Sequence, residues 1–226
     1  MKKFSIQGSS VLILASLILF SCVESNEGNN EMDSRTEFLP YYSEATFNPL
    51  WLNKDSKILD TIHTIPSFSF TNQDGETVSD KTFEGKIYVT DFFFTTCPGI
   101  CPAMTANLKI LQDAFIEDND VLLLSHSVTP ESDSVSILKR YANRKGVISG
   151  KWHLVTGDRD EIYTLGRSSY FVEEDLGLEK DVEEFLHTEN FVLIDKNKHI
   201  RGIYNGLNKT SVKQLIADIK TLKKEG

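Results

Sequence analysis

The stretch Lys86–Met104, KIYVTDFFFTTCPGICPAM, joins a run of apolar and aromatic residues to two cysteines, each followed by proline. The run is long enough for a buried strand, and the residues after it carry apolar side chains at helical spacing. We therefore expect a strand, a short turn and a helix, with Cys97 and Cys101 where the helix begins. The partial positive charge of a helix N-terminus favours a thiolate over a thiol.

Strand-like and helix-like segments alternate on both sides of this stretch. Residues 67–79 predict a hairpin with its turn at Asp74-Gly75, and residues 190–206 predict a second hairpin. A last helix follows, for which Ser211 and Gln214 form an expected capping box. The order of segments resembles an α/β thioredoxin-like fold with an N-terminal hairpin and an acidic insertion, Glu173 to Glu184, before His187. This insertion is most simply a solvated loop.

Composition and charge limit the classes of partner. The chain has 226 residues, of which 40% are hydrophobic, a formal net charge of −9 and a pI near 5.1. An acidic surface repels nucleic acid and anionic lipid, so neither is expected as the main partner. We expect a folded domain at residues 58–226, preceded by an acidic tether and an aromatic arm at residues 22–57.

The N-terminus resembles a bacterial secretion signal. Lys2 and Lys3 precede the apolar run Val11 to Phe20, which is too short to span a bilayer, a task that needs about 20 residues. LFSC, ending at Cys22, resembles a lipoprotein processing site. Residues 1–21 are then a lipoprotein signal peptide, and an acylated Cys22 anchors the protein to a membrane outside the cytoplasm. The alternative is an ordinary cleaved signal, with Cys22 lost.

Cys97 and Cys101 are then the only cysteines of the folded part. A structural disulfide is one reading of the pair. Closing so short a loop contributes only about 2 kcal/mol, however, and a domain of this size does not need such a cross-link. A redox-active or metal-binding pair is the favoured interpretation.

The spacing of the two cysteines suits a shared ligand. Residues four apart on a helix place their Cβ atoms about 5–6 Å apart, slightly far for a disulfide. Two thiolates are soft donors that suit Cu(I), so a third donor is the residue to find. His126 and His187 both remain candidates on spacing alone. The other histidines have simpler explanations, His199 as a solvated residue and His153 as a satisfied core residue or a surface residue, while His63 precedes the first hairpin.

Several motifs together resemble the Sco/SenC family of copper-binding assembly factors. They are CPGICP after DFFFTT, then VTPESDSV, WHLVTG and a lone histidine shortly before FVLID, in this order. The resemblance implies a copper ion held by Cys97, Cys101 and His187. Asp133 matches the P-x-x-D pattern of the family, where the simplest role is to cap the following helix.

The resemblance implies a membrane-tethered copper protein, more a metallochaperone than an enzyme. Its expected partner is the copper-bearing subunit of cytochrome c oxidase, or another copper or thiol protein, to which it delivers copper or whose cysteines it keeps reduced. The alternative is a thiol-disulfide reductase in which Cys97 attacks and Cys101 resolves without metal. A peroxidase fits less well, because Phe94 stands where that family has threonine. A third possibility is a non-catalytic lipoprotein in which a Cys97–Cys101 disulfide only shapes a binding surface.

Overall fold

The structure is a computed structural model that describes residues 32–173 and 185–226. The expected signal peptide, the lipidation site Cys22 and most of the acidic segment lie outside the described residues. Within the described part of the chain, no helix has the length and apolar character needed to cross a membrane.

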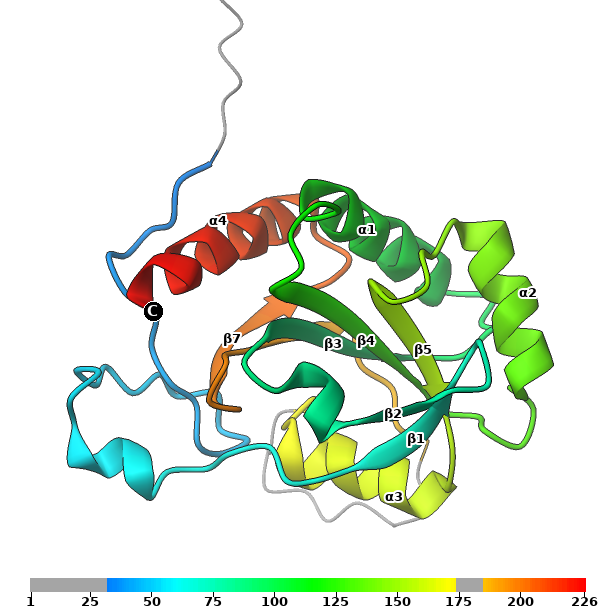
Figure 1. The fold of residues 1–226 in the computed structure, drawn as a ribbon, viewed down its shortest axis with the longest axis horizontal. Helices are drawn as coiled ribbons and strands as arrows, with labels where there is room; N and C mark the ends of the chain where they lie inside the picture. Colours follow the sequence, from blue (N-terminus) through cyan, green and yellow to red (C-terminus); the bar gives the residue numbers. More distant parts are fainter. Residues whose placement is uncertain (1–31, 174–184) are drawn as a thin grey trace, which may run out of the picture. The chain divides into compact units, whose positions relative to one another are not determined.

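Within the described residues, seven strands form one mixed sheet in the order β2-β1-β5-β4-β3-β6-β7 (Figure 1). β4 pairs in parallel with β3 and β5, and the remaining pairs are antiparallel. The strands are β1 (Ser69–Asn72), β2 (Thr77–Ser79), β3 (Ile87–Phe93), β4 (Val121–Ser127), β5 (Trp152–Thr156), β6 (Asn190–Ile194) and β7 (Ile200–Asn205). Both predicted hairpins are confirmed, and this is the expected α/β thioredoxin-like arrangement.

Helices cover both faces of the sheet. Figure 1 shows α1 and α4 along one side and α3 on the opposite side. Side chains of α1, α2 and α4 join one buried cluster, and those of α3 join the other. The helices are α1 (Cys101–Ala114), α2 (Val135–Lys145), α3 (Arg159–Thr164), α4 (Lys209–Glu225), the 3-10 helices η1 (Lys57–Asp60) and η2 (Asp80–Phe83), and the π-helix η3 (Leu165–Ser169).

The central strand β3 is buried along its whole length. Its side chains alternate between the two clusters, Val89 and Phe93 toward α1 and Tyr88 and Phe92 toward α3. A strand covered on both faces needs the near-continuous apolar sequence that predicted it. The cysteine turn therefore follows directly from a strand at the centre of the core.

One helix boundary differs from the sequence prediction. α4 begins at Lys209, and the side chain of Asn208 accepts hydrogen bonds from the backbone N–H groups of Thr210 and Ser211. The predicted capping box of Ser211 and Gln214 is therefore wrong. Asn208 is a good N-cap residue that lies one turn earlier, so it begins the helix first.

The predicted arm packs onto the sheet. Leu39 and Tyr41 are buried, and Tyr42 pairs with Ile200 of β7 through a backbone hydrogen bond of 3.0 Å. The arm belongs to the same compact unit as the strands and helices. Its aromatic composition therefore reflects contact with the core.

Candidate metal site

The two cysteines lie where β3 passes into α1. Cys97 lies in the connecting turn, where its backbone N–H donates to Phe94 O, and Cys101 is the first residue of the helix. The cysteines therefore do not share one helical face, as their spacing had predicted, because the helix begins four residues later than Cys97. Both thiols are free. Cys101 is 5% exposed, while Cys97 is only partly buried and is the more accessible sulfur.

The two thiols at the helix N-terminus have pKa values shifted in opposite directions. Burial raises the pKa of Cys97, but hydrogen bonds to its sulfur from the backbone N–H and thiol of Cys101, and from the N–H groups of Gly99 and Ile100, outweigh burial and lower this pKa below its ordinary value. Burial first, and the Cys97 and Asp91 side chains in addition, raise the pKa of Cys101 to about 12, although a hydrogen bond with the Phe94 backbone lowers it. Of the two, Cys97 is the more acidic thiol and Cys101 the less acidic one.

A buried carboxylate holds the cysteine turn in place. Asp133 accepts hydrogen bonds from the backbone N–H of Thr95 at 3.1 Å and from its hydroxyl at 2.5 Å. It also accepts from the hydroxyls of Ser127 and Thr129, at 2.6 and 3.2 Å. The expected helix-capping role is wrong, because Ser134 is the N-cap of α2. Asp133 instead ties the end of β4 to the residues just before Cys97.

Sequence reasoning missed a second buried carboxylate near the thiols. Asp91 of β3 is 2% exposed and accepts a hydrogen bond from the Ser125 hydroxyl, which in turn accepts one from Trp152 Nε1 at 2.8 Å. Burial raises the pKa of Asp91 to about 7, although the Ser125 hydrogen bond lowers it. Its signal was present as the only charged residue within the apolar strand IYVTDFFF.

The segment that carries His187 is anchored on both sides of this residue. Phe185 packs edge to face on Phe94, with ring centroids 5.4 Å apart, and Leu186 is buried. The Thr188 hydroxyl donates to Val172 O at 2.7 Å. His187 itself is exposed between these anchors. The Phe185–Phe94 contact brings this segment against the residue three positions before Cys97.

His126 lies on the other side of the sheet. It is 0% exposed, stacks on Phe92 with ring centroids 4.7 Å apart, and shares a hydrogen bond of 3.1 Å between its Nδ1 and Thr90 Oγ1. Burial lowers the pKa of His126 to about 3. Alternation along β4 places it in the α3 cluster, whereas Cys97 and Cys101 belong to the α1 cluster. This geometry separates His126 from the thiols.

The remaining histidines have structural contacts. His153 is buried beside Asn72, as expected for a satisfied core residue. The prediction of a solvated His199 is wrong, because His199 is 7% exposed and its Nδ1 lies 3.1 Å from His63 O. His63 Nε2 in turn lies 2.8 Å from Ser169 O. These contacts leave His187 as the exposed histidine of the described residues.

Among residues 32–173 and 185–226, no three His, Cys, Asp or Glu side chains are close enough together to hold a metal ion. The described site thus provides two sulfur donors, with His187 on a neighbouring segment. The donor chemistry fits a soft, low-coordinate ion such as Cu(I), because both donors are sulfur, the pKa of Cys97 is lowered, and no carboxylate cluster of the described residues surrounds the pair.

Comparisons with known proteins agree with this geometry. The family model described as SCO1/SenC matches residues 57–224. A SCO1 protein homolog of Bacillus subtilis is 32% identical over 163 residues, which is 70% of this chain and 82% of that protein. The range matched by the family model spans the cysteine turn, His126 and His187.

Three solved structures share the fold. A SCO1/SenC family lipoprotein from Bacillus anthracis is 33% identical, with a TM-score of 0.62 over 71% of this chain and 95% of that one. BsSco, described as a Sco family cytochrome c oxidase assembly protein with a disulfide switch, is 31% identical (TM-score 0.59; 71% and 93%). Copper-bound ScoI of Bradyrhizobium japonicum is 26% identical (TM-score 0.55; 71% and 98%). The chain belongs to the SCO1/SenC family.

Proposed function

We propose that this chain binds copper through Cys97 and Cys101 and serves in the assembly of cytochrome c oxidase. The observation that carries the proposal is the pair of free thiols at the β3–α1 junction, one of them with a lowered pKa. Copper in the related ScoI and the assembly role of BsSco support it. The finer role is delivery of copper to the binuclear site of an oxidase subunit, or reduction of the cysteines of that site.

Each ligand has a distinct task. Cys97 offers a thiolate at the accessible end of the turn, and Cys101 must lose its proton when the metal ion binds, so binding releases protons. His187 is proposed as the third donor, through an imidazole nitrogen that suits either oxidation state of copper. Asp133 fixes the backbone of Thr95 and so limits how far the sulfur of Cys97 can move.

We also propose that Cys22 is acylated and holds the protein on the outer side of a membrane. LFSC at Cys22 and the related Bacillus anthracis lipoprotein support the anchor. Compartments outside the cytoplasm are oxidising, so an unbound thiol pair there is exposed to disulfide formation. Copper binding then requires the pair to be reduced first.

Thiol-disulfide exchange is the second candidate, and the unequal acidity of the two thiols favours it. The Cys97 thiolate would attack a partner disulfide, forming a mixed disulfide and releasing one partner thiolate. Cys101, after losing its proton, would attack Cys97 Sγ and release the second partner thiolate. The partner gains two electrons, and this chain ends with a Cys97–Cys101 disulfide.

Copper titration separates the two candidates. The reduced protein should bind about one copper ion per chain, and Cys97→Ser or Cys101→Ser should abolish tight binding, because each removes a thiolate donor. Protein oxidised beforehand should bind little copper. Copper binding that is indifferent to both substitutions would refute the copper proposal, whereas metal-free turnover of a disulfide substrate would favour the exchange reaction.

A further inference from the structure

The chain ahead of β1 exposes aromatic surface. Three of the eight large apolar side chains exposed in the described residues lie there: Phe38, Trp51 and Ile58. Phe38 is 45% exposed and Trp51 is 53% exposed, and their rings meet edge to face with centroids 5.8 Å apart. We call Phe38 and Trp51 the aromatic edge. Single exposed apolar residues are common, but a paired Phe and Trp form a surface that water solvates poorly.

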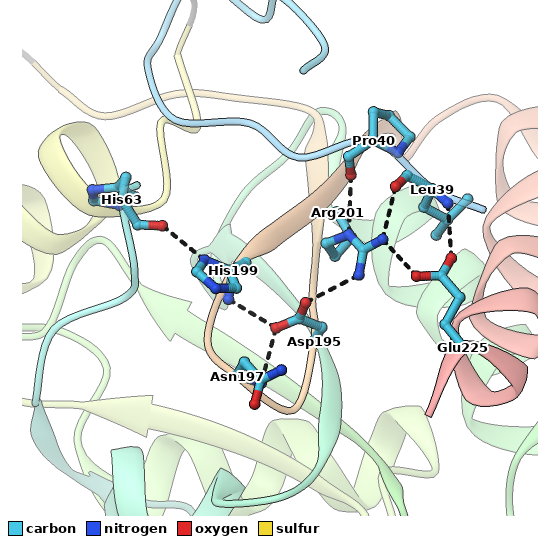
Figure 2. A network of polar contacts seen from close by, with 8 residues as sticks. All are labelled: Leu39, Pro40, His63, Asp195, Asn197, His199, Arg201 and Glu225. Carbon is cyan, nitrogen blue, oxygen red and sulfur yellow. Dashed lines mark hydrogen bonds and ion pairs between the residues drawn. The ribbon is translucent and has the colours of Figure 1, made fainter. Parts of the chain in front are cut away.

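Arg201 fixes the chain beside Phe38. Its Nε donates to Pro40 O at 3.1 Å, and its Nη2 donates to Leu39 O at 2.7 Å (Figure 2). Arg201 also forms ion pairs with Asp195 at 3.1 Å and Glu225 at 2.6 Å, and Glu225 accepts a hydrogen bond from Leu39 N. Figure 2 shows how these contacts join β7, the end of α4 and the arm. Phe38 is therefore presented from an ordered backbone.

The Trp51 side of the edge is fixed by backbone pairing. Tyr41 and Leu50 exchange two backbone hydrogen bonds of 2.9 and 2.8 Å. These bonds hold Leu50, the residue before Trp51, against Tyr41. A surface that is already ordered loses little conformational entropy when it binds. The aromatic edge is therefore a preorganised contact surface.

Arg201, which holds the arm beside Phe38, lies at the opposite end of the sheet from the cysteine turn. Ile200, next to Arg201, pairs with Ile194, and Ile194 pairs with Tyr88 at the start of β3. Cys97 follows the other end of β3, which contains seven residues. At about 3.3 Å per residue, the strand separates the two ends by roughly 20 Å. The aromatic edge itself extends along the outer side of the edge strand β7, because Trp51 lines one hollow together with Ile203, Tyr204 and Asn208.

We propose that the aromatic edge rests in the interfacial layer of the membrane that carries the Cys22 anchor. The 15 residues between Cys22 and Phe38 can span at most about 50 Å, which is long enough for the edge to reach the bilayer. Tryptophan prefers this layer, where its ring is buried and its N–H stays hydrated. The placement rests on the proposed anchor and is independent of copper.

Charged residues of both signs surround the edge, since Glu37 and Asp55 are exposed as well as two cations. Arg35 and Lys54 are exposed three residues from Phe38 and Trp51, respectively, where they can meet lipid phosphates. The net charge of −9 opposes general attraction to anionic lipid. Insertion of the two rings into a largely zwitterionic surface is therefore the main source of binding.

Fluorescence quenching tests this placement on the full, lipid-anchored chain in phosphatidylcholine vesicles. Lipids brominated near the headgroup should reduce Trp51 emission roughly twofold, because bromine quenches an indole ring that lies in the interfacial layer. Trp152 is 1% exposed and serves as an internal reference, and Trp51→Phe identifies the share of Trp51. Phe38→Ser should weaken quenching. Ile148→Ser, which alters an exposed apolar residue before β5, on the other side of β3 in the sheet, should leave quenching unchanged.

Two outcomes would overturn the proposal. One is Trp51 emission that brominated lipid leaves unchanged, including the case in which Trp51 becomes shielded only when a partner protein is added. The other is a full chain recovered without an acyl group. Repeating the experiment with and without copper separates this result from the copper proposal, since quenching should be the same in both.

Discussion

His126 and His187 show how differently one residue type behaves on two sides of the cysteine strand. His126 is fully buried in the α3 cluster, stacked on Phe92. His187 is exposed on a segment that Phe185 fastens to Phe94. Burial keeps the first imidazole neutral and part of the core, whereas the second is free to accept a metal ion. The face of the sheet thus separates a packing role for His126 from the ligand role proposed for His187.

The largest expected effect is a pH dependence of stability due to His126. Its pKa is about 3 in the folded protein, against 6.5 as its ordinary value. His126 therefore becomes protonated near pH 6.5 in the unfolded chain but stays neutral in the folded chain. The free energy of unfolding accordingly decreases as pH falls below 6.5. Between pH 7 and pH 5 the loss should be about 2 kcal/mol.

Denaturant unfolding of the parent and of His126→Phe at both pH values checks this prediction. The phenylalanine ring has no proton to gain, so the variant should lack this part of the pH dependence. Equal pH dependence in the two proteins would show that burial does not hold His126 neutral. It would contradict the contrast between a buried, neutral His126 and an exposed His187.

A smaller effect is expected at the anchor of the cysteine turn. Asp133→Asn replaces one acceptor oxygen by an NH2 group that faces the donors of Thr95, Ser127 and Thr129. We expect a loss of about 1–2 kcal/mol in unfolding free energy and weaker copper binding. Asp113→Asn, which alters an exposed carboxylate paired with Lys109, is the matched control and should change both by little.

Thermal unfolding and copper titration on both variants measure this effect. The account of the turn fails if Asp133→Asn binds copper as the parent does, or if Asp113→Asn weakens binding equally.

The smallest effect concerns the residue after His187. Thr188→Val removes the hydrogen bond to Val172 O and should cost about 1 kcal/mol, while Thr188→Ser should restore it. If Thr188 positions His187, the valine variant should also weaken copper binding a few-fold. That weakening should disappear when His187 is already alanine, which a double-mutant cycle measures. Additive losses would mean that Thr188 acts on stability alone.

Local patterns predicted the framework because each depended on neighbouring residues. The buried strand β3 and the hairpin turn at Gly75 follow from an apolar run and from a glycine with positive φ. The two thiols could be placed at the strand–helix junction for the same reason. His187 required the family resemblance, since spacing alone did not separate it from His126.

Contacts between distant parts of the chain could not be predicted. Asp133 contacts Thr95 across 38 positions, and Arg201 contacts Leu39 across 162. His199 is buried because the arm and the residues before β1 cover a turn that looks solvated in the sequence. No periodicity records such pairings, because they depend on how the elements pack.

Copper binding by His187→Ala beside His126→Phe tests the central claim most directly, with unfolding measured on both variants. The account predicts that His187→Ala folds normally, binds copper at least about tenfold more weakly and shifts the spectrum of the Cu(II) form, because a ligand is lost. His126→Phe should bind copper as the parent does. A folded His187→Ala that holds copper as tightly as the parent would contradict the account.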